Sequence, residues 1–281
     1  MKSPLIANNT SRREFIRSAS ATTVAGALLA SPFHALAQLP KGGAAEAESG
    51  LGANPTLDAS LKFNPDGTVK PFAGNTVICH VPQQCRFRDG AVGLHDALVQ
   101  SSFAHKLGIL PPESYHMTVY SGANDQNRVH SSWPGGVPLD ASIEECSRVM
   151  KERMKEVRLT CQLPLRIRIN TAGTMHYGRA STLRMEGADA ASEHVLRSVR
   201  DQLADVYKFR APDHDTYVFH ITIAYTMADM SAAEMSAYRL ILQKAVDQMT
   251  ASTPVLELGM PEYCTFRDMY RFDPEVMLRS S

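Results

Sequence analysis

The chain has 281 residues and a net charge of zero, with 44% hydrophobic, 21% charged and 7% aromatic residues. This composition excludes an acidic disordered tail, a collagen-like repeat and a coiled coil, and is typical of one large globular domain or two small ones. The balanced charge disfavours a protein that grips long nucleic acid, because that affinity comes from an excess of Lys and Arg. A single nucleotide remains open as a ligand.

Residues 1–37 have the pattern of an export signal. Two adjacent arginines, Arg12 and Arg13, precede Phe15 and a short apolar run, and a small-residue A-x-A cleavage signal ends at Ala37. The Ser-Arg-Arg-x-Phe order resembles the twin-arginine type of signal. Because the apolar run has about 12 residues where a membrane span needs about 20, we expect no stable membrane anchor. We expect export by the twin-arginine translocase, cleavage after Ala37, and a periplasmic or secreted protein.

The rest of the chain divides into a flexible leader over 38–60 and one domain over 61–281. The first part of the leader is rich in Gly, Ala, Glu and Asn and has no apolar periodicity. Apolar residues at helical spacing predict helices over 91–107, 143–157, 190–207 and 235–249. Short apolar or alternating runs predict strands over 75–81, 115–120, 165–170, 180–185 and 216–225, with one or two more in 254–270.

This order of elements predicts an α+β or α/β architecture. It also contains a weak internal repeat, because the helices 91–107 and 190–207 are each followed by a polar or proline break and a strand with the sequence H-x-T. The repeat predicts two similar lobes. Five cysteines, an odd number without zinc or redox spacing, predict reduced and mostly buried thiols.

The two strands of the repeat carry the pattern His, apolar, Thr, apolar, once from His116 and once from His220. Side chains at i and i+2 of a strand share a face, so each His stands beside its own Thr, Thr118 or Thr222, and the apolar positions face the core. A third H-x-T at His214 lacks both apolar neighbours, and we interpret it as a chance match. The remaining His residues are expected on surfaces or helix faces, at positions 80, 95, 105, 130, 176, 194 and 214.

Two imidazoles and two hydroxyls are the groups needed for nucleophilic attack on a phosphodiester. A neutral His takes a proton from water or a ribose hydroxyl, a protonated His gives one to the leaving oxygen, and the hydroxyls donate to the nonbridging oxygens. This chemistry requires no metal, and no H-x3-H or H-E-x-x-H zinc spacing occurs. Tyr120, four residues after His116, is expected to line the cleft or stack a base. Arg184 either reaches into the cleft or lies on a solvated sheet face.

With these motifs, and with the runs GNTVICHV, SYHMTVYSG and HITIAYT, the sequence resembles the two-histidine (2H) phosphoesterase superfamily and its bacterial 2H-phosphodiesterase-like branch. The resemblance is strongest over residues 61–270. It implies a bilobal, pseudo-symmetric fold in which two antiparallel sheets, flanked by helices, enclose a central cleft.

The resemblance also implies roles for residues. His116 and His220 would be the acid and base, Thr118 and Thr222 the phosphate ligands, and Tyr225, three residues after the second Thr, a further phosphate ligand. Simple strand parity turns Tyr225 away from His220, so this role requires a bulge or a strand end. No cofactor is implied.

The expected activity is metal-independent hydrolysis of 2′,3′-cyclic or short nucleotide phosphodiesters, with a small nucleotide or an RNA end as substrate. The alternative is a non-catalytic protein that holds a phosphorylated ligand in the same cleft, since a fold does not guarantee an activity. A third hypothesis is an acyl hydrolase that uses a Cys and a His.

Overall fold

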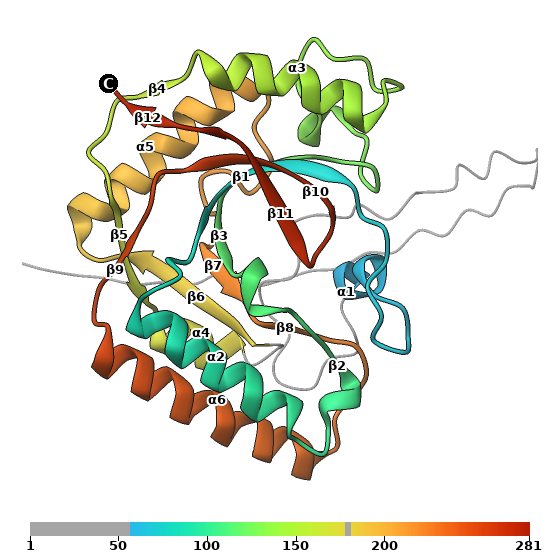
Figure 1. Ribbon diagram of the computed structural model, residues 1–281, viewed down its shortest axis with the longest axis vertical. Helices are drawn as coiled ribbons and strands as arrows, with labels where there is room; N and C mark the ends of the chain where they lie inside the picture. The colour runs from blue at the N-terminus through green and yellow to red at the C-terminus, as the bar shows by residue number, and fades with distance from the viewer. Residues whose placement is uncertain (1–56, 178–180) are drawn as a thin grey trace, which may run out of the picture. The chain divides into compact units, whose positions relative to one another are not determined.

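The computed structural model describes residues 57–177 and 181–281, so the predicted signal and the leader up to residue 56 lie outside the described residues. Within them, helices and strands alternate along the chain (Figure 1). The helices are α1 Leu57–Lys62, α2 Arg86–Val99, α3 Ile143–Lys155, α4 Thr171–Tyr177, α5 Ala190–Tyr207 and α6 Ala232–Ser252. The strands are β1 Gly74–His80, β2 Leu107–Ile109, β3 His116–Asn124, β4 Arg158–Leu159, β5 Leu165–Ile169, β6 Thr182–Gly187, β7 His220–Thr222, β8 Ala224–Thr226, β9 Leu256–Leu258, β10 Glu262–Asp268, β11 Arg271–Met277 and β12 Arg279–Ser280.

Eight of the described strands form one curled antiparallel sheet in the order β11-β10-β1-β3-β7-β6-β5-β9 (Figure 1). The strands β3 and β7 lie at its centre and join through the register pair Met117 and Ile221. The predicted mixture of helices with antiparallel strands is therefore confirmed. The strands expected in two sheets are hydrogen-bonded into one, and the pseudo-symmetry of the lobes stays a prediction. The range 254–270 holds two strands, β9 and β10, as expected, and β11 and β12 follow beyond it.

The helices form pairs at opposite ends of the sheet, α2 beside α6 and α3 beside α5 (Figure 1). Three of them begin at side-chain caps, Ser142 before α3, Asp189 before α5 and Ser231 before α6. Each cap accepts a hydrogen bond from an otherwise unpaired backbone N–H, which stabilises a helix by about 1 kcal/mol. These three helices lie within a few residues of their predicted bounds, and α5 matches its prediction.

The helix α2 departs most from its prediction, 91–107. It begins after Cys85, whose Sγ accepts a hydrogen bond from the backbone N–H of Arg88 at 3.4 Å, and thiols are not among the usual capping groups. Gly108, the residue that directly follows the predicted helix, lies in β2. A Cβ there would come within 2.9 Å of the Phe63 ring, so this glycine serves close packing.

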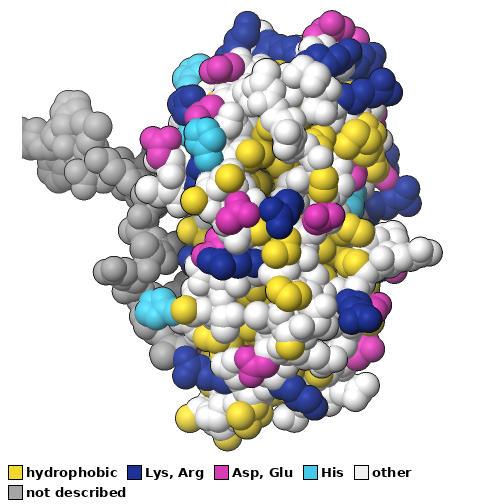
Figure 2. Space-filling model, turned by 90° about the vertical axis from the view of Figure 1, so that its left-hand side faces the viewer, with side chains coloured by type: hydrophobic (Ala, Val, Ile, Leu, Met, Phe, Trp, Pro, Cys, Tyr) yellow, Lys and Arg dark blue, Asp and Glu magenta, His cyan; other side chains and the backbone are white. Residues whose placement is uncertain are grey.

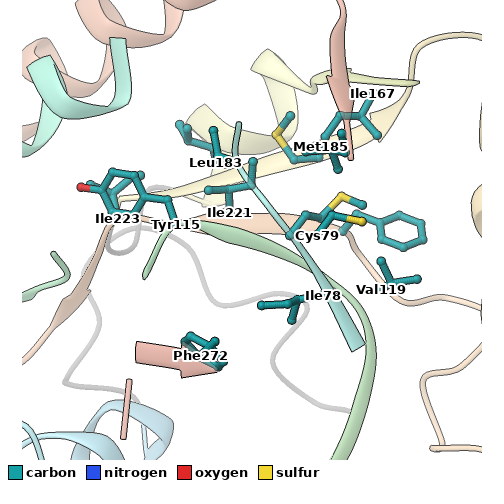
Figure 3. Close-up of a cluster of buried hydrophobic side chains, with 14 of the residues drawn as sticks. Ile78, Cys79, Tyr115, Val119, Ile167, Leu183, Met185, Ile221, Ile223 and Phe272 are labelled. Carbon is teal, nitrogen blue, oxygen red and sulfur yellow. The ribbon is translucent and has the colours of Figure 1, made fainter. Parts of the chain in front are cut away.

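The central strands bury one face in the core. Met117 of β3 and Ile221 of β7 are both fully buried. Figure 3 shows Ile221 with Leu183 on one side of these strands, and Phe272 on the other. A slip of one residue would exchange the two faces and expose apolar side chains, each of which stabilises the fold by about 1.5–3 kcal/mol when buried. Because the apolar residues of β3 and β7 must face the core, the polar residues that alternate with them face the opposite side of the sheet.

A bulge in β3 reverses the direction of the side chains beyond Thr118. Two consecutive residues of β1 lie opposite Thr118 and Tyr120, so Val119 is the extra residue. The carbonyl of Val119 accepts a hydrogen bond from Nη1 of the buried Arg200 at 2.7 Å. Because the bulge interrupts the alternation, residues 116 and 120 do not share a face.

Candidate active site

The pairing of β3 with β7 brings the two H-x-T motifs side by side. Their second positions, Met117 and Ile221, are register partners. Because the strands are antiparallel, the His of each motif lies opposite the Thr of the other. His116 and His220 are therefore diagonal neighbours on one face of the sheet, a relation that places residues about 7 Å apart. Two imidazoles at such a separation can hold one tetrahedral phosphate between them.

Both imidazoles are fixed by the same local hydrogen bond. Nδ1 of His116 lies 2.6 Å from the carbonyl oxygen of Ser114, and Nδ1 of His220 lies 2.8 Å from that of Val218. A carbonyl oxygen can only accept, so in each ring Nδ1 carries the proton and donates it. In a neutral ring, Nε2 is then the nitrogen that can accept a proton.

His116 is held as a neutral imidazole. Its ring lies against the ring of Phe272, with centroids 4.1 Å apart. Burial lowers the pKa of His116 to about 3; the positive charges of His80, His220 and Lys62 act in the same direction, while the hydrogen bond to Ser114 opposes them. The free protein therefore presents His116 ready to accept a proton.

A cavity of about 220 Å³ lies over this face of the sheet. His116, His220, Thr222 and Tyr225, four of the predicted site residues, line it. Another part of its wall is aromatic and consists of Phe72, Phe266 and Phe272. The cavity thus joins proton-transfer groups to a flat apolar surface.

Tyr225 reaches the cavity because the predicted strand 216–225 breaks in two. β7 ends at Thr222, and the next three-residue strand, β8, pairs with β2 instead of continuing along β3. This break supplies the strand end that the predicted role of Tyr225 requires. The Tyr225 hydroxyl accepts a hydrogen bond from Lys62 Nζ at 3.3 Å.

Thr118 and Arg184 flank the cavity. Thr118 is half-buried, and its side chain is hydrogen-bonded with the hydroxyl of Tyr217. Arg184 of β6 is the register partner of His220, and its backbone N–H donates to Thr174 Oγ1 at 2.9 Å. Neither belongs to the described residues that line the cavity. The structure therefore places both next to the two histidines in the strand register, but not in the wall of the cavity.

Tyr120 lies away from the cavity that it was expected to line. Its side chain is 2% exposed, and its hydroxyl donates to the carbonyl oxygen of Phe209 at 2.5 Å. Its ring stacks on that of Tyr207 of α5, with centroids 5.0 Å apart. The expectation assumed unbroken alternation along the strand, and the bulge at Val119 turns Tyr120 toward the helix.

Two residues of the site region, Lys62 and His80, were not predicted from the sequence. Lys62 ends α1, which begins within the predicted leader, and it lines the cavity. His80 was expected on a surface or helix face, but it ends β1 as the register partner of His116. Its Nδ1 lies 2.7 Å from Glu262 Oε2. The sequence held one signal for His80, which is a titratable residue near the end of the apolar run NTVICHV.

The third H-x-T has a structural role. The expectation of a surface or helix-face position for His214 was wrong, because its side chain is buried at 5% exposure and its Nε2 lies 3.0 Å from Asp201 Oδ1 on α5. His214 is absent from the residues that line the described cavity, in agreement with the interpretation of this motif as a chance match.

Comparison with known proteins gives a partial match to the class of protein that this geometry indicates. Residues 62–177 match the family model 2H-phosphodiest, described as a domain of unknown function (DUF1868). His116 and Thr118 lie inside the matched segment, and the second motif lies beyond it. The match supports, at the level of class, a phosphoesterase-type enzyme related to the two-histidine phosphoesterases.

Among solved structures, the chain is similar to a conserved protein of unknown function from Agrobacterium tumefaciens. The two are 26% identical, with a TM-score of 0.72, and the similarity covers 80% of this chain and 94% of that chain. No curated protein matches the chain. The similarity extends the shared fold well beyond the segment that the family model covers.

Proposed function

We propose that the protein is a phosphodiesterase that hydrolyses 2′,3′-cyclic or short nucleotide phosphodiesters between His116 and His220, without a metal in the reaction. The register of β3 and β7 carries the proposal, because it sets two imidazoles and two threonines on one face beside a cavity. Proton transfer at both ends of a phosphodiester needs two such groups, one neutral and one charged.

We assign the base to His116 and the acid to His220. His116 is neutral in the free protein because burial lowers its pKa, so it can take a proton from water or a ribose hydroxyl through Nε2. A bound phosphate anion favours the imidazolium that results. The hydrogen bond of His220 is solvent-exposed, whereas that of His116 is partly buried. Water can therefore stabilise a charged His220, which gives its proton to the leaving oxygen.

The negative charge of the transition state requires donors around the phosphate. Thr222, Tyr225 and Lys62 line the cavity and can donate to the nonbridging oxygens. Thr118 lies opposite His220 and is proposed to act on the other side, with its hydroxyl positioned by Tyr217. Lys62 adds a full positive charge, which the dianionic state attracts more strongly than the anionic ground state.

The surroundings favour a small substrate. A cavity of about 220 Å³ accommodates part of a nucleotide, and the Phe72, Phe266 and Phe272 wall offers its base a flat apolar contact. Positive and negative side chains alternate on the face drawn in Figure 2, so that face offers no continuous basic track for a long polyanion.

The test is hydrolysis of a panel of 2′,3′-cyclic nucleotides by the purified full chain in excess chelator. We expect turnover with a bell-shaped pH profile, and a loss of at least about a hundredfold in His116→Ala and His220→Ala. His130→Ala changes an exposed histidine and serves as the matched control. Unchanged turnover in both site variants would refute the proposal. Calorimetric binding of the nucleotides without product would favour the alternative of a non-catalytic binding protein.

We also propose that the protein acts outside the cytoplasm, after export through the twin-arginine translocase. The proposal rests on Arg12 and Arg13 and on the A-x-A signal that ends at Ala37. In the part of the chain that the structure describes, none of the helices has the length and apolar character needed to cross a membrane. Replacing both arginines by lysine should leave the protein in the cytoplasmic fraction; an unchanged periplasmic share would disprove this route.

A further inference from the structure

Three side chains that commonly bind metals meet beside His116. Nδ1 of His80 lies 2.7 Å from Glu262 Oε2, and Sγ of Cys264 lies 4.0 Å from the same oxygen. One ligand atom of each residue lies within 4.8 Å of the others. A zinc ion with ligand bonds of about 2.0–2.3 Å in tetrahedral geometry separates its ligands by roughly 3–4 Å. The three atoms therefore stand close to the positions that a bound ion requires.

The chemistry of the three ligands selects the type of metal. An imidazole nitrogen, a thiolate sulfur and a carboxylate oxygen together suit Zn²⁺, whereas Mg²⁺ and Ca²⁺ take oxygen ligands. Burial, followed by the negative charge of Glu262, raises the pKa of the Cys264 thiol. The thiol therefore keeps its proton until a divalent cation neutralises this charge and reverses the preference.

An ion can reach the three residues from one side. The side chains of His80 and Glu262 are 19% and 13% exposed, whereas Cys264 is fully buried beneath them. The strands β1 and β10 are paired at five successive positions that end at Ile78 and Glu262, and His80 is paired with His116 of β3, so the backbone holds the ligands in place. Such preorganisation limits the entropy lost on binding.

We propose that His80, Glu262 and Cys264 form a site for a divalent transition-metal ion, Zn²⁺ being the best fit, and that the bound ion inhibits the neighbouring His116. On binding, the thiol of Cys264 releases its proton to water and forms a bond between sulfur and metal. The proton that Nδ1 of His80 donates to Glu262 leaves Nδ1, and Nε2 takes up a proton from water, so that Nδ1 supplies a lone pair to the metal. Glu262 supplies a carboxylate oxygen, and water takes the fourth position. No group is oxidised or reduced.

The inhibition follows from the position of His80. It is the register partner of His116, and the centroids of the two rings are 6.4 Å apart. Binding of a divalent ion with loss of the thiol proton raises the net charge of the site by one unit, which opposes the charge that His116 gains when it accepts a proton, enough to slow turnover at least about tenfold. This inhibition rests on the proposed function, but metal binding does not.

Binding is tested by titrating the full chain with Co²⁺, whose bond to a thiolate gives a charge-transfer band in the near ultraviolet. We expect the band to saturate at one ion per chain and to disappear when Zn²⁺ displaces Co²⁺. Cys264→Ser should abolish the band, and His80→Gln and Glu262→Gln should each weaken Co²⁺ binding at least about tenfold. Cys161→Ser, which changes a half-buried thiol elsewhere, should leave the band unchanged.

The absence of a band in the full chain, or a band that survives in Cys264→Ser, would overturn the site. If Cys264→Ser does not fold, unchanged Co²⁺ affinity in both His80→Gln and Glu262→Gln would overturn it instead. Inhibition is measured by adding Zn²⁺ to the phosphodiesterase assay, where chelator should restore the rate. Saturation of the Co²⁺ band without any effect of Zn²⁺ on turnover would refute the control of His116 while leaving the metal site standing.

Discussion

The burial of His116 makes the free energy of unfolding depend on pH in a way that one substitution can remove. Burial lowers the pKa of His116 from 6.5 to about 3 in the folded protein, with the charges of His80, His220 and Lys62 as smaller causes. In the unfolded chain the ring returns to about 6.5. Between these values the unfolded state binds a proton that the folded state does not. Stability is therefore fully retained above 6.5 and decreases as the pH falls toward 3.

The expected size follows from the shift. Each pH unit below 6.5 removes about 1.4 kcal/mol, so the change from about pH 8 to about pH 5 removes about 2 kcal/mol. Water that reaches the half-buried ring screens this value toward about 1 kcal/mol. His116→Gln keeps a polar amide but cannot take up the proton. The free energy of unfolding of the wild type should therefore fall by about 1–2 kcal/mol more than that of the variant.

Urea denaturation of both proteins at the two pH values measures this difference. Loss of packing in His116→Gln lowers its stability equally at both pH values and cancels, as do all other titrating groups. What remains is the proton affinity of His116. If both proteins lose the same free energy between the two pH values, the ring is not held neutral, and the assignment of His116 as the base fails.

Three further substitutions test the surroundings of the site. Tyr225→Phe removes a donor to the phosphate but keeps the ring, so turnover should fall about tenfold to a hundredfold while the melting temperature stays unchanged; equal turnover would exclude the donor role. Gly122→Ala places a Cβ against the backbone and side-chain oxygens of Asn75, and should lower the free energy of unfolding by about 1–3 kcal/mol in urea denaturation. Arg200→Met leaves the carbonyl of Val119 without its donor and should cost about 1–3 kcal/mol; an unchanged denaturation midpoint would contradict the role given to this contact.

The parts of the site that sequence could predict depend on local geometry. The alternation of side chains along a strand placed His116 with Thr118, and His220 with Thr222, because two residues of one strand need no partner to share a face. The same local logic located α5, whose apolar spacing and Asp189 cap agree. Both inferences use contacts within a few residues of the chain, where the physical rules are strongest.

The parts that could not be predicted depend on pairing between distant segments. The bulge that turns Tyr120 away is held by Arg200, a residue 81 positions from the carbonyl that it contacts. His80 becomes part of the site through Glu262, which lies 182 positions away. No periodicity in either segment reports such a partner, because the pairing is decided by the topology of the whole sheet.

This distinction explains why the sequence shows no spacing of His or Cys residues that is typical of a zinc site. Motifs such as H-x3-H place two ligands on one turn of a helix, whereas a sheet can gather ligands from separate strands at any distance in the chain. Glu262 and Cys264 share a face of β10, and His80 joins them from β1. On its other side His80 borders His116 of β3, so β1 carries a proposed metal ligand directly beside a histidine of the proposed active site. A metal ion bound there could change catalysis without moving any strand, because the register already holds its ligand His80 next to His116 and the charge of the ion acts across that short distance.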